Sequence, residues 1–193
     1  VYGTLDGTLP VKPSSLYDLA SITKIAASTL SLMHLEERGE FNRNDPLETY
    51  LPELKGTSFG SRKLQDILAH RAGLTSWIPF YLEALEDSTA FDVKATSLHS
   101  QKVTNGCFMR PSWQDSIWHK IKEAPLDPVG KHRYSDLGFY AIQRIIERIT
   151  QSPLDEFVNE TFYDEAGWNS LGFNPLDRME ARSIAPTEND TLF

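Results

Sequence analysis

Apolar side chains recur at helical spacing along several stretches of the chain. The strongest stretch covers residues 21–38, where apolar or small residues occupy nearly every position until Glu36-Glu37-Arg38 and a stop at Gly39. We expect a buried helix there. The same pattern predicts a helical turn ending near 50–52, a helix capped by Ser61 and stopped by Gly73, a short helix around 79–86, and helices over 116–124, 137–150 and 153–163.

Strand-like alternation is scarce. Residues 1–11 indicate a short strand or hairpin with Asp6-Gly7 at its turn. Residues 75–115 show no sustained period apart from their short helix, so we expect long loops there, and the tail over 167–193 is loop-like with room for one short strand. The chain therefore predicts a mostly helical α+β structure.

Composition and charge narrow the class of protein. A chain of 193 residues can hold one domain with a sizeable core, and a net charge of −8 without a basic cluster disfavours nucleic-acid binding. The single Cys107 allows no intramolecular disulfide and leaves the redox compartment undecided; a small buried hydrophobe is its simplest interpretation. No apolar run is long enough to span a membrane and no signal peptide is visible. Because the chain opens at Val1 and not at methionine, we expect a processed or excised piece.

The segment Ser21-Ile22-Thr23-Lys24 lies where a turn enters the apolar helix. A serine and a lysine three residues apart at a helix start share one face, so the amine lies within hydrogen-bond reach of the hydroxyl. Serine is a weak nucleophile until a neighbouring base or cation helps to remove its proton. Unpaired backbone N–H groups of the first helical turn also favour developing negative charge. The pattern therefore predicts an activated serine.

The S-x-x-K pattern alone is a weak signal, since about one match is expected by chance in a chain of this composition. Its alternative explanation is a helix-capping serine followed by a solvated lysine. The apolar helix favours the chemical interpretation. Burial of Lys24 at the first turn would lower the lysine pKa and free the amine for proton transfer.

Tyr134-Ser135-Asp136 stands at the junction of a loop and the helix predicted over 137–150. A tyrosine acts as a general base or acid when nearby cations lower its pKa from about 10. The alternative is a core tyrosine with Asp136 capping the helix. Together with Ser21 and Lys24, however, the tripeptide predicts one site. We expect Ser21 Oγ and Lys24 Nζ to lie roughly 2.6–3.5 Å apart.

Five segments in this order resemble the serine β-lactamase and penicillin-binding-protein superfamily, particularly its class C-like and esterase-like branch. They are residues 17–24, 36–47, 50–54, 66–74 and 134–138. The resemblance implies an α+β fold of the β-lactamase/transpeptidase type. It also implies that residues 1–193 are a partial domain, mostly the helical part with only an edge of the antiparallel sheet, without the N-terminal strands and the C-terminal sheet portion.

The resemblance assigns roles to four residues. It implies that Ser21 is the acyl-forming nucleophile, that Lys24 is its activating partner, and that Tyr134 relays the proton to the leaving group and later activates water. Asp136 stands where most members have the asparagine of Tyr-x-Asn, and the resemblance implies that it binds substrate or tunes Lys24. The resemblance also requires the Tyr134 hydroxyl near Lys24 or Ser21, and Asp136 beside Lys24. An ionised aspartate only accepts hydrogen bonds, which weakens the case for β-lactam hydrolysis. We expect His70 to be a structural core histidine.

The third motif of the superfamily, Lys-Thr-Gly or His-x-Gly on a strand, does not occur after Tyr134. In relatives that strand carries one of the N–H donors to the oxyanion, and losing one such donor typically costs on the order of 10²–10³ in rate. We therefore expect little activity from the 193-residue chain by itself.

Two functions remain open at this point. The first is an acyl-serine hydrolase for an amide or ester, with a peptidoglycan peptide as the expected substrate; the second is a non-catalytic module that binds muropeptides. The resemblance implies no cofactor or metal, a small peptide, ester or β-lactam-like partner, and a periplasmic or cell-envelope location. Ala185-Pro186-Thr187-Glu188 is similar to a stretch in relatives fused to glycoside hydrolases, which by analogy predicts such a fused domain.

Overall fold

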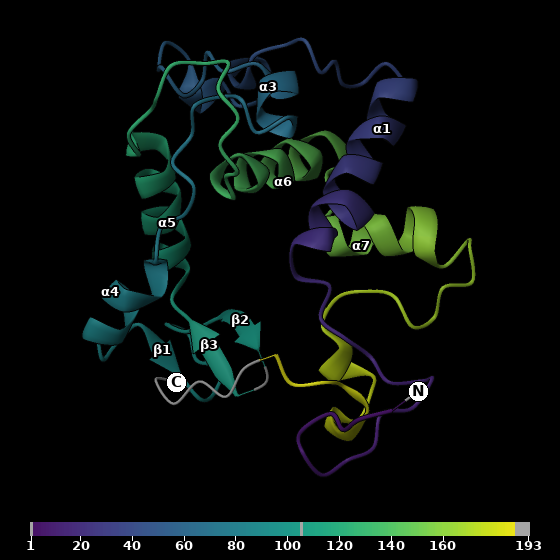
Figure 1. Cartoon of the computed structure of the whole chain (residues 1–193). Coiled ribbons are helices and arrows are strands. Elements are labelled where there is room, and N and C mark those ends of the chain that lie inside the picture. Colours follow the sequence, from purple (N-terminus) through teal and green to yellow (C-terminus); the bar gives the residue numbers. More distant parts are fainter. Residues whose placement is uncertain (1, 105, 188–193) are drawn as a thin grey trace.

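Helices dominate the computed structural model, which describes residues 2–104 and 106–187 (Figure 1). The α-helices are α1 Leu30–Glu37, α2 Leu47–Tyr50, α3 Leu64–Leu68, α4 Phe80–Glu86, α5 Pro111–Glu123, α6 Leu137–Thr150 and α7 Leu154–Val158. Shorter or wider helical turns are η1 Ala20–Ile22, η2 Lys24–Thr29, η3 Pro52–Leu54, η4 Asn159–Tyr163, η5 Pro175–Asp177 and η6 Ala181–Ser183. None of the helices in this part of the chain has the length and apolar character needed to cross a bilayer.

Helix α6 is the centre of the core. Its apolar positions recur at three- and four-residue spacing, so one stripe of the helix is buried almost completely: Leu137, Ala141, Ile142, Ile145 and Ile146. In Figure 1, α6 crosses the middle of the molecule, with α3 above it and α7 below it. Helices α2 and α3, α7 and the turn η2 all pack against α6. The helix predicted over 137–150 is confirmed with the same bounds.

The helix predicted over 21–38 is helical from residue 20 to residue 37, but the expectation that it is buried on nearly every side was wrong. Ala27, Leu32 and Leu35 face the core, whereas Ile25 and Met33 are 70% and 63% exposed. The segment packs on α6 and α7 through one face. Small and apolar residues lie around the whole helix, so the sequence pattern does not show which side of the helix is exposed.

A small antiparallel sheet lies within the stretch that the sequence predicted to be loops. Its strands are β1 Phe91–Asp92, β2 Gln101–Thr104 and β3 Cys107–Met109, in the order β1-β3-β2, with Met109 opposite both Phe91 and Gln101. The expectation of loops was wrong here because strands of two to four residues carry no readable alternation. The α+β class and the predominance of helix are confirmed.

Several predicted boundaries also differ. Helix α5 begins at Pro111, whose fixed φ suits the first helical position, and not at 116. Helix α3 begins at Leu64 after Lys63, and the Ser61 hydroxyl donates to the Ser58 carbonyl instead of capping it. It also ends at Leu68, well before Gly73.

The chain segment that leads to η1 runs beside the last described residues, below the helices in Figure 1. Leu16 pairs in parallel with Ile184, through a hydrogen bond from the Leu16 N–H to the Ser183 carbonyl at 2.8 Å. The hairpin predicted over 1–11 is reduced, among residues 2–11, to one antiparallel bridge between Thr4 and Pro10. The Asp6 turn is present, since its carboxylate accepts the backbone N–H groups of Thr8 and Leu9.

Gly138 offers a test of how closely α6 packs on α3. A Cβ at this position would overlap Cγ2 of Ile67 and lie 3.1 Å from Cδ1 of Leu74. We expect Gly138→Ala to lower the free energy of unfolding by about 1–3 kcal/mol, because overpacking forces neighbouring side chains to shift. Urea denaturation measures the loss. Gln143→Ala on the exposed face of α6 is the matched control, expected within about 0.5 kcal/mol of the wild type. Equal stability of the two variants would contradict the close contact.

Candidate active site

Ser21 and Lys24 lie at the start of the long helical segment. Ser21 is in the turn η1, and Lys24 is the first residue of η2, so their side chains leave the same face. The Lys24 ammonium donates a hydrogen bond to Ser21 Oγ at 2.9 Å. The Lys24 side chain is 16% exposed, so it is enclosed by protein. The contact predicted from the spacing of these residues is present.

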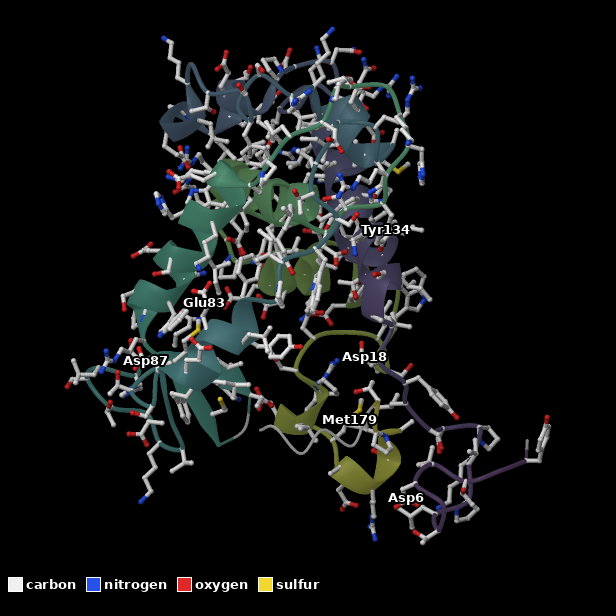
Figure 2. The ribbon with its side chains drawn as sticks, turned by 60° about the vertical axis from the view of Figure 1, so that its left-hand side comes forward. Asp6, Asp18, Glu83, Asp87, Tyr134 and Met179 are labelled. Carbon is white, nitrogen blue, oxygen red and sulfur yellow. The ribbon has the colours of Figure 1, made fainter. Side chains whose placement is uncertain are left out.

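The backbone turns sharply just before Ser21. Ala20 has φ +45°, in the left-handed region that residues other than glycine seldom adopt. The Asp18 carboxylate accepts the Ala20 N–H at 2.7 Å and so holds this turn. Figure 2 shows Asp18 on the purple segment that leads into the helix. Asp18 was not predicted from the sequence, although an aspartate two residues before a turn amide is the signal that could have found it.

Tyr134 and Asp136 reach the same point from the loop before α6. Asp136 is the N-cap residue of α6, but its side chain makes no capping bond. Its Oδ1 is buried and lies 2.6 Å from Lys24 Nζ, so the ammonium compensates the charge of the carboxylate. Lys24 Nζ also lies 5.1 Å from the centre of the Tyr134 ring. Figure 2 shows Tyr134 beside the purple helix, away from Glu83 and Asp87.

Two backbone and side-chain contacts fix this loop. The Ser135 hydroxyl, almost fully buried, donates to the Thr75 carbonyl at 2.6 Å. The Asp136 N–H donates to the Ser76 carbonyl at 2.9 Å. The Ser135 side chain and the Asp136 amide therefore hold the loop against residues 75–76. Ser135 is a second residue that the sequence analysis left without a role.

Lys24 is an ammonium ion in this site. Desolvation lowers its pKa, but hydrogen bonds with Asp136 and Tyr134, together with their charges, outweigh burial and raise the pKa above its usual value. The expectation that burial would lower this pKa and free the amine was therefore wrong. It weighed desolvation alone, and the anion that faces Lys24 comes from a distant part of the chain.

Tyr134 has the opposite shift. A hydrogen bond with Lys24, and then one with Ser21, lowers the Tyr134 pKa from its usual value, while slight burial and the negative charge of Asp136 act against this. Tyr134 is 45% exposed, so solvent reaches this residue. Since Lys24 holds its proton, Tyr134 is the group of this set that is best placed to accept a proton from Ser21.

His70 lies next to Tyr134 and not in the core, so the expected core position was wrong. It is half-buried, with φ +53° and its ring centre 4.4 Å from that of Tyr134. Its Nδ1 accepts the Ser135 N–H at 3.2 Å. Burial lowers the His70 pKa, and the nearby His132 and Lys24 lower it further, so the ring is neutral at neutral pH.

The arrangement combines a serine hydroxyl, an ammonium and a tyrosine of lowered pKa, which together can transfer an acyl group through the serine. Among residues 2–104 and 106–187, no three His, Cys, Asp or Glu side chains are grouped so that they could hold an ion.

Comparison with known proteins places the chain among relatives. The family model described as Beta-lactamase matches residues 1–189. A protein of Escherichia coli (strain K12) with the name "Putative D-alanyl-D-alanine carboxypeptidase" is 30% identical over 192 residues, which cover 93% of this chain and 39% of the relative. A protein of the same name from Salmonella agona (strain SL483) is 32% identical over 184 residues, which cover 91% of this chain and 38% of the relative. The chain thus spans about two fifths of the length of these relatives.

Solved structures share the fold. The octameric penicillin-binding protein homologue from Pyrococcus abyssi has a TM-score of 0.66 at 20% identity, covering 95% of this chain and 39% of that one. A class C beta lactamase from Rhodobacter sphaeroides has a TM-score of 0.57 at 21% identity, and the match covers 86% of this chain and 39% of the lactamase chain. The β-lactamase/transpeptidase-like fold expected from the resemblance is confirmed.

The charge of Asp136 can be tested through Lys24. We expect Asp136→Asn to lower the Lys24 pKa, because the carboxylate that raises it is lost while desolvation, which lowers it, remains. NMR titration of protein with ¹³C-labelled lysine measures this pKa. Asp127→Asn is the matched control, since Asp127 pairs with Arg133 and should leave Lys24 unaffected. A Lys24 pKa that stays the same in Asp136→Asn would contradict the ion pair.

Proposed function

The chain belongs to the beta-lactamase family, and on that basis we propose that it carries the nucleophile of an acyl-serine hydrolase acting on an amide or ester. One observation carries the proposal: Lys24 Nζ lies 2.9 Å from Ser21 Oγ and 2.6 Å from Asp136 Oδ1, beside the Tyr134 ring. The names of the curated relatives support a peptidoglycan peptide as substrate and the cell envelope as location.

The proposed reaction begins at Ser21. Its Oγ attacks the carbonyl carbon of the substrate and gives its proton to the Tyr134 oxygen, which the Lys24 ammonium stabilises in the ionised form. The tetrahedral intermediate collapses, the bond to the leaving group breaks, and Tyr134 returns the proton to that group. In the second half, Tyr134 takes a proton from water as the water attacks the acyl carbon. The bond between the acyl carbon and Ser21 Oγ then breaks, and Tyr134 returns the proton to Oγ, which regenerates Ser21.

Asp136 sets the charge state of Lys24, on which these reaction steps depend. An ionised carboxylate 2.6 Å from Lys24 keeps the lysine protonated, so Tyr134 and not Lys24 is the proposed base. The carboxylate has no donor to offer a substrate carbonyl. We therefore propose peptide amides or esters as substrates ahead of β-lactams.

The second candidate is a non-catalytic module that binds muropeptides. The absence of a donor at Asp136 favours it. The close contacts of Ser21, Lys24 and Tyr134 favour the hydrolase, because ligand binding alone does not require a serine next to an ammonium and a tyrosine of lowered pKa.

We also propose two features of the larger protein. One is that residues 1–193 form part of a larger β-lactamase-like domain. The other is a fused glycoside hydrolase, suggested by the segment 185–188, whose Glu188 lies outside the described residues.

A fluorophosphonate probe, which phosphonylates activated serines, tests the proposal. We expect it to label Ser21 of the full-length protein, with the site located by peptide mapping. Ser21→Ala should abolish labelling, and Tyr134→Phe should slow it by roughly 10²–10⁴-fold through loss of the proton acceptor. Ser61→Ala, a change of an exposed serine in another part of the fold, is the control and should label at the wild-type rate. A folded protein that does not label would instead favour the binding module.

A further inference from the structure

We infer that His70 is a positioning residue for Tyr134, and that it acts through the neutral ring as a hydrogen-bond acceptor. The inference rests on the proposed function, because it gives His70 a part in placing the proton acceptor of that reaction. His70 itself touches neither Ser21 nor substrate in this account.

His70 holds the chain on both sides of Tyr134. Its carbonyl accepts the N–H of Arg133 at 2.8 Å, and its Nδ1 accepts the N–H of Ser135 at 3.2 Å. Its ring packs on the Tyr134 ring, with centres 4.4 Å apart and planes 33° from parallel. Three contacts from one residue therefore set the backbone and the ring of Tyr134, whose hydroxyl meets Lys24 and Ser21.

The backbone at His70 makes these contacts possible. Its φ of +53° is left-handed, so the carbonyl and the side chain of the same residue both reach the loop before α6. Histidine and asparagine are among the residues enriched in this region. Asparagine would keep the backbone geometry and supply an acceptor oxygen, whereas phenylalanine would keep the ring and lose the acceptor.

Protonation of His70 would remove the acceptor, since both ring nitrogens then carry hydrogen. The groups that face the ring are Tyr134, Lys24, Asp136 and the exposed His132, whose ring centre is 6.0 Å away. His132 and Lys24 oppose a positive charge on His70, as does burial, while Asp136 favours it. The acceptor is therefore lost only at a pH below the usual histidine pKa of 6.5.

The test compares two variants by the rate at which the fluorophosphonate labels Ser21 of the full-length protein, measured across pH. At neutral pH we expect the labelling rate of His70→Asn to stay within about threefold of the wild-type rate, since asparagine keeps the acceptor and the backbone geometry. His70→Phe should label roughly 10- to 100-fold more slowly, the range expected when a reacting group is misplaced. Both variants should lose the fall in rate at acid pH that protonation of His70 produces. His132→Asn, a neighbouring exposed histidine, is the control and should keep the wild-type rate at neutral pH.

The outcomes separate the inference from the proposed function. An equal loss of labelling rate in His70→Asn and His70→Phe, or an unchanged pH profile of that rate in both variants, would overturn the inference. Labelling of the wild type would still support the proposed hydrolase. A wild type that does not label overturns the hydrolase, and the positioning contact is then tested by hydrogen exchange of the Ser135 amide. Its protection should fall as His70 is protonated and should not depend on pH in this way in His70→Asn. If the protection of the Ser135 amide does not change when His70 is protonated, the hydrogen bond between His70 and Ser135 is contradicted.

Discussion

The ammonium of Lys24 is shared between Ser21, Asp136 and Tyr134, and the organisation of the site follows from that sharing. A lysine only 16% exposed loses much of its hydration, which by itself favours the neutral amine. Asp136 and Tyr134 outweigh this loss, so the charge stays on Lys24. That charge in turn makes Tyr134 easier to ionise. In the proposed mechanism, this cation separates the two roles: Lys24 is the electrostatic partner and Tyr134 is the base.

The fold must bring two distant segments together to build this group. Lys24 is the first residue of η2, which packs on α6, and Asp136 is the residue directly before α6. Hydrogen bonds from Ser135 and Asp136 to residues 70, 75 and 76 then fix the loop before α6. Each of these contacts uses a backbone group on at least one side, and the small Ser135 side chain needs only its hydroxyl to hold the loop.

The sequence predicted the parts of this arrangement that local patterns encode. The stripe of α6 is strong enough that its bounds were predicted correctly, and the spacing of Ser21 and Lys24 predicts their contact from helix geometry alone. The charge state of Lys24 could not be predicted in this way, because it depends on how closely Asp136 approaches. The short strands β1 to β3 and the exposed side of Ile25 and Met33 were missed, since both depend on tertiary neighbours. His70 was misplaced for the same reason: its role depends on a left-handed backbone that its residue type permits but does not dictate.

The most direct test of this account is the ionisation of Tyr134 itself, followed by ultraviolet absorbance. The titration of the wild type minus that of Tyr134→Phe isolates one of the seven tyrosines. The account predicts that Tyr134 ionises below the usual pKa of 10.0, and that Lys24→Met moves this step upward by removing the cation. A Tyr134 that titrates at or above the usual value in the wild type, or that is indifferent to the loss of Lys24, would contradict it.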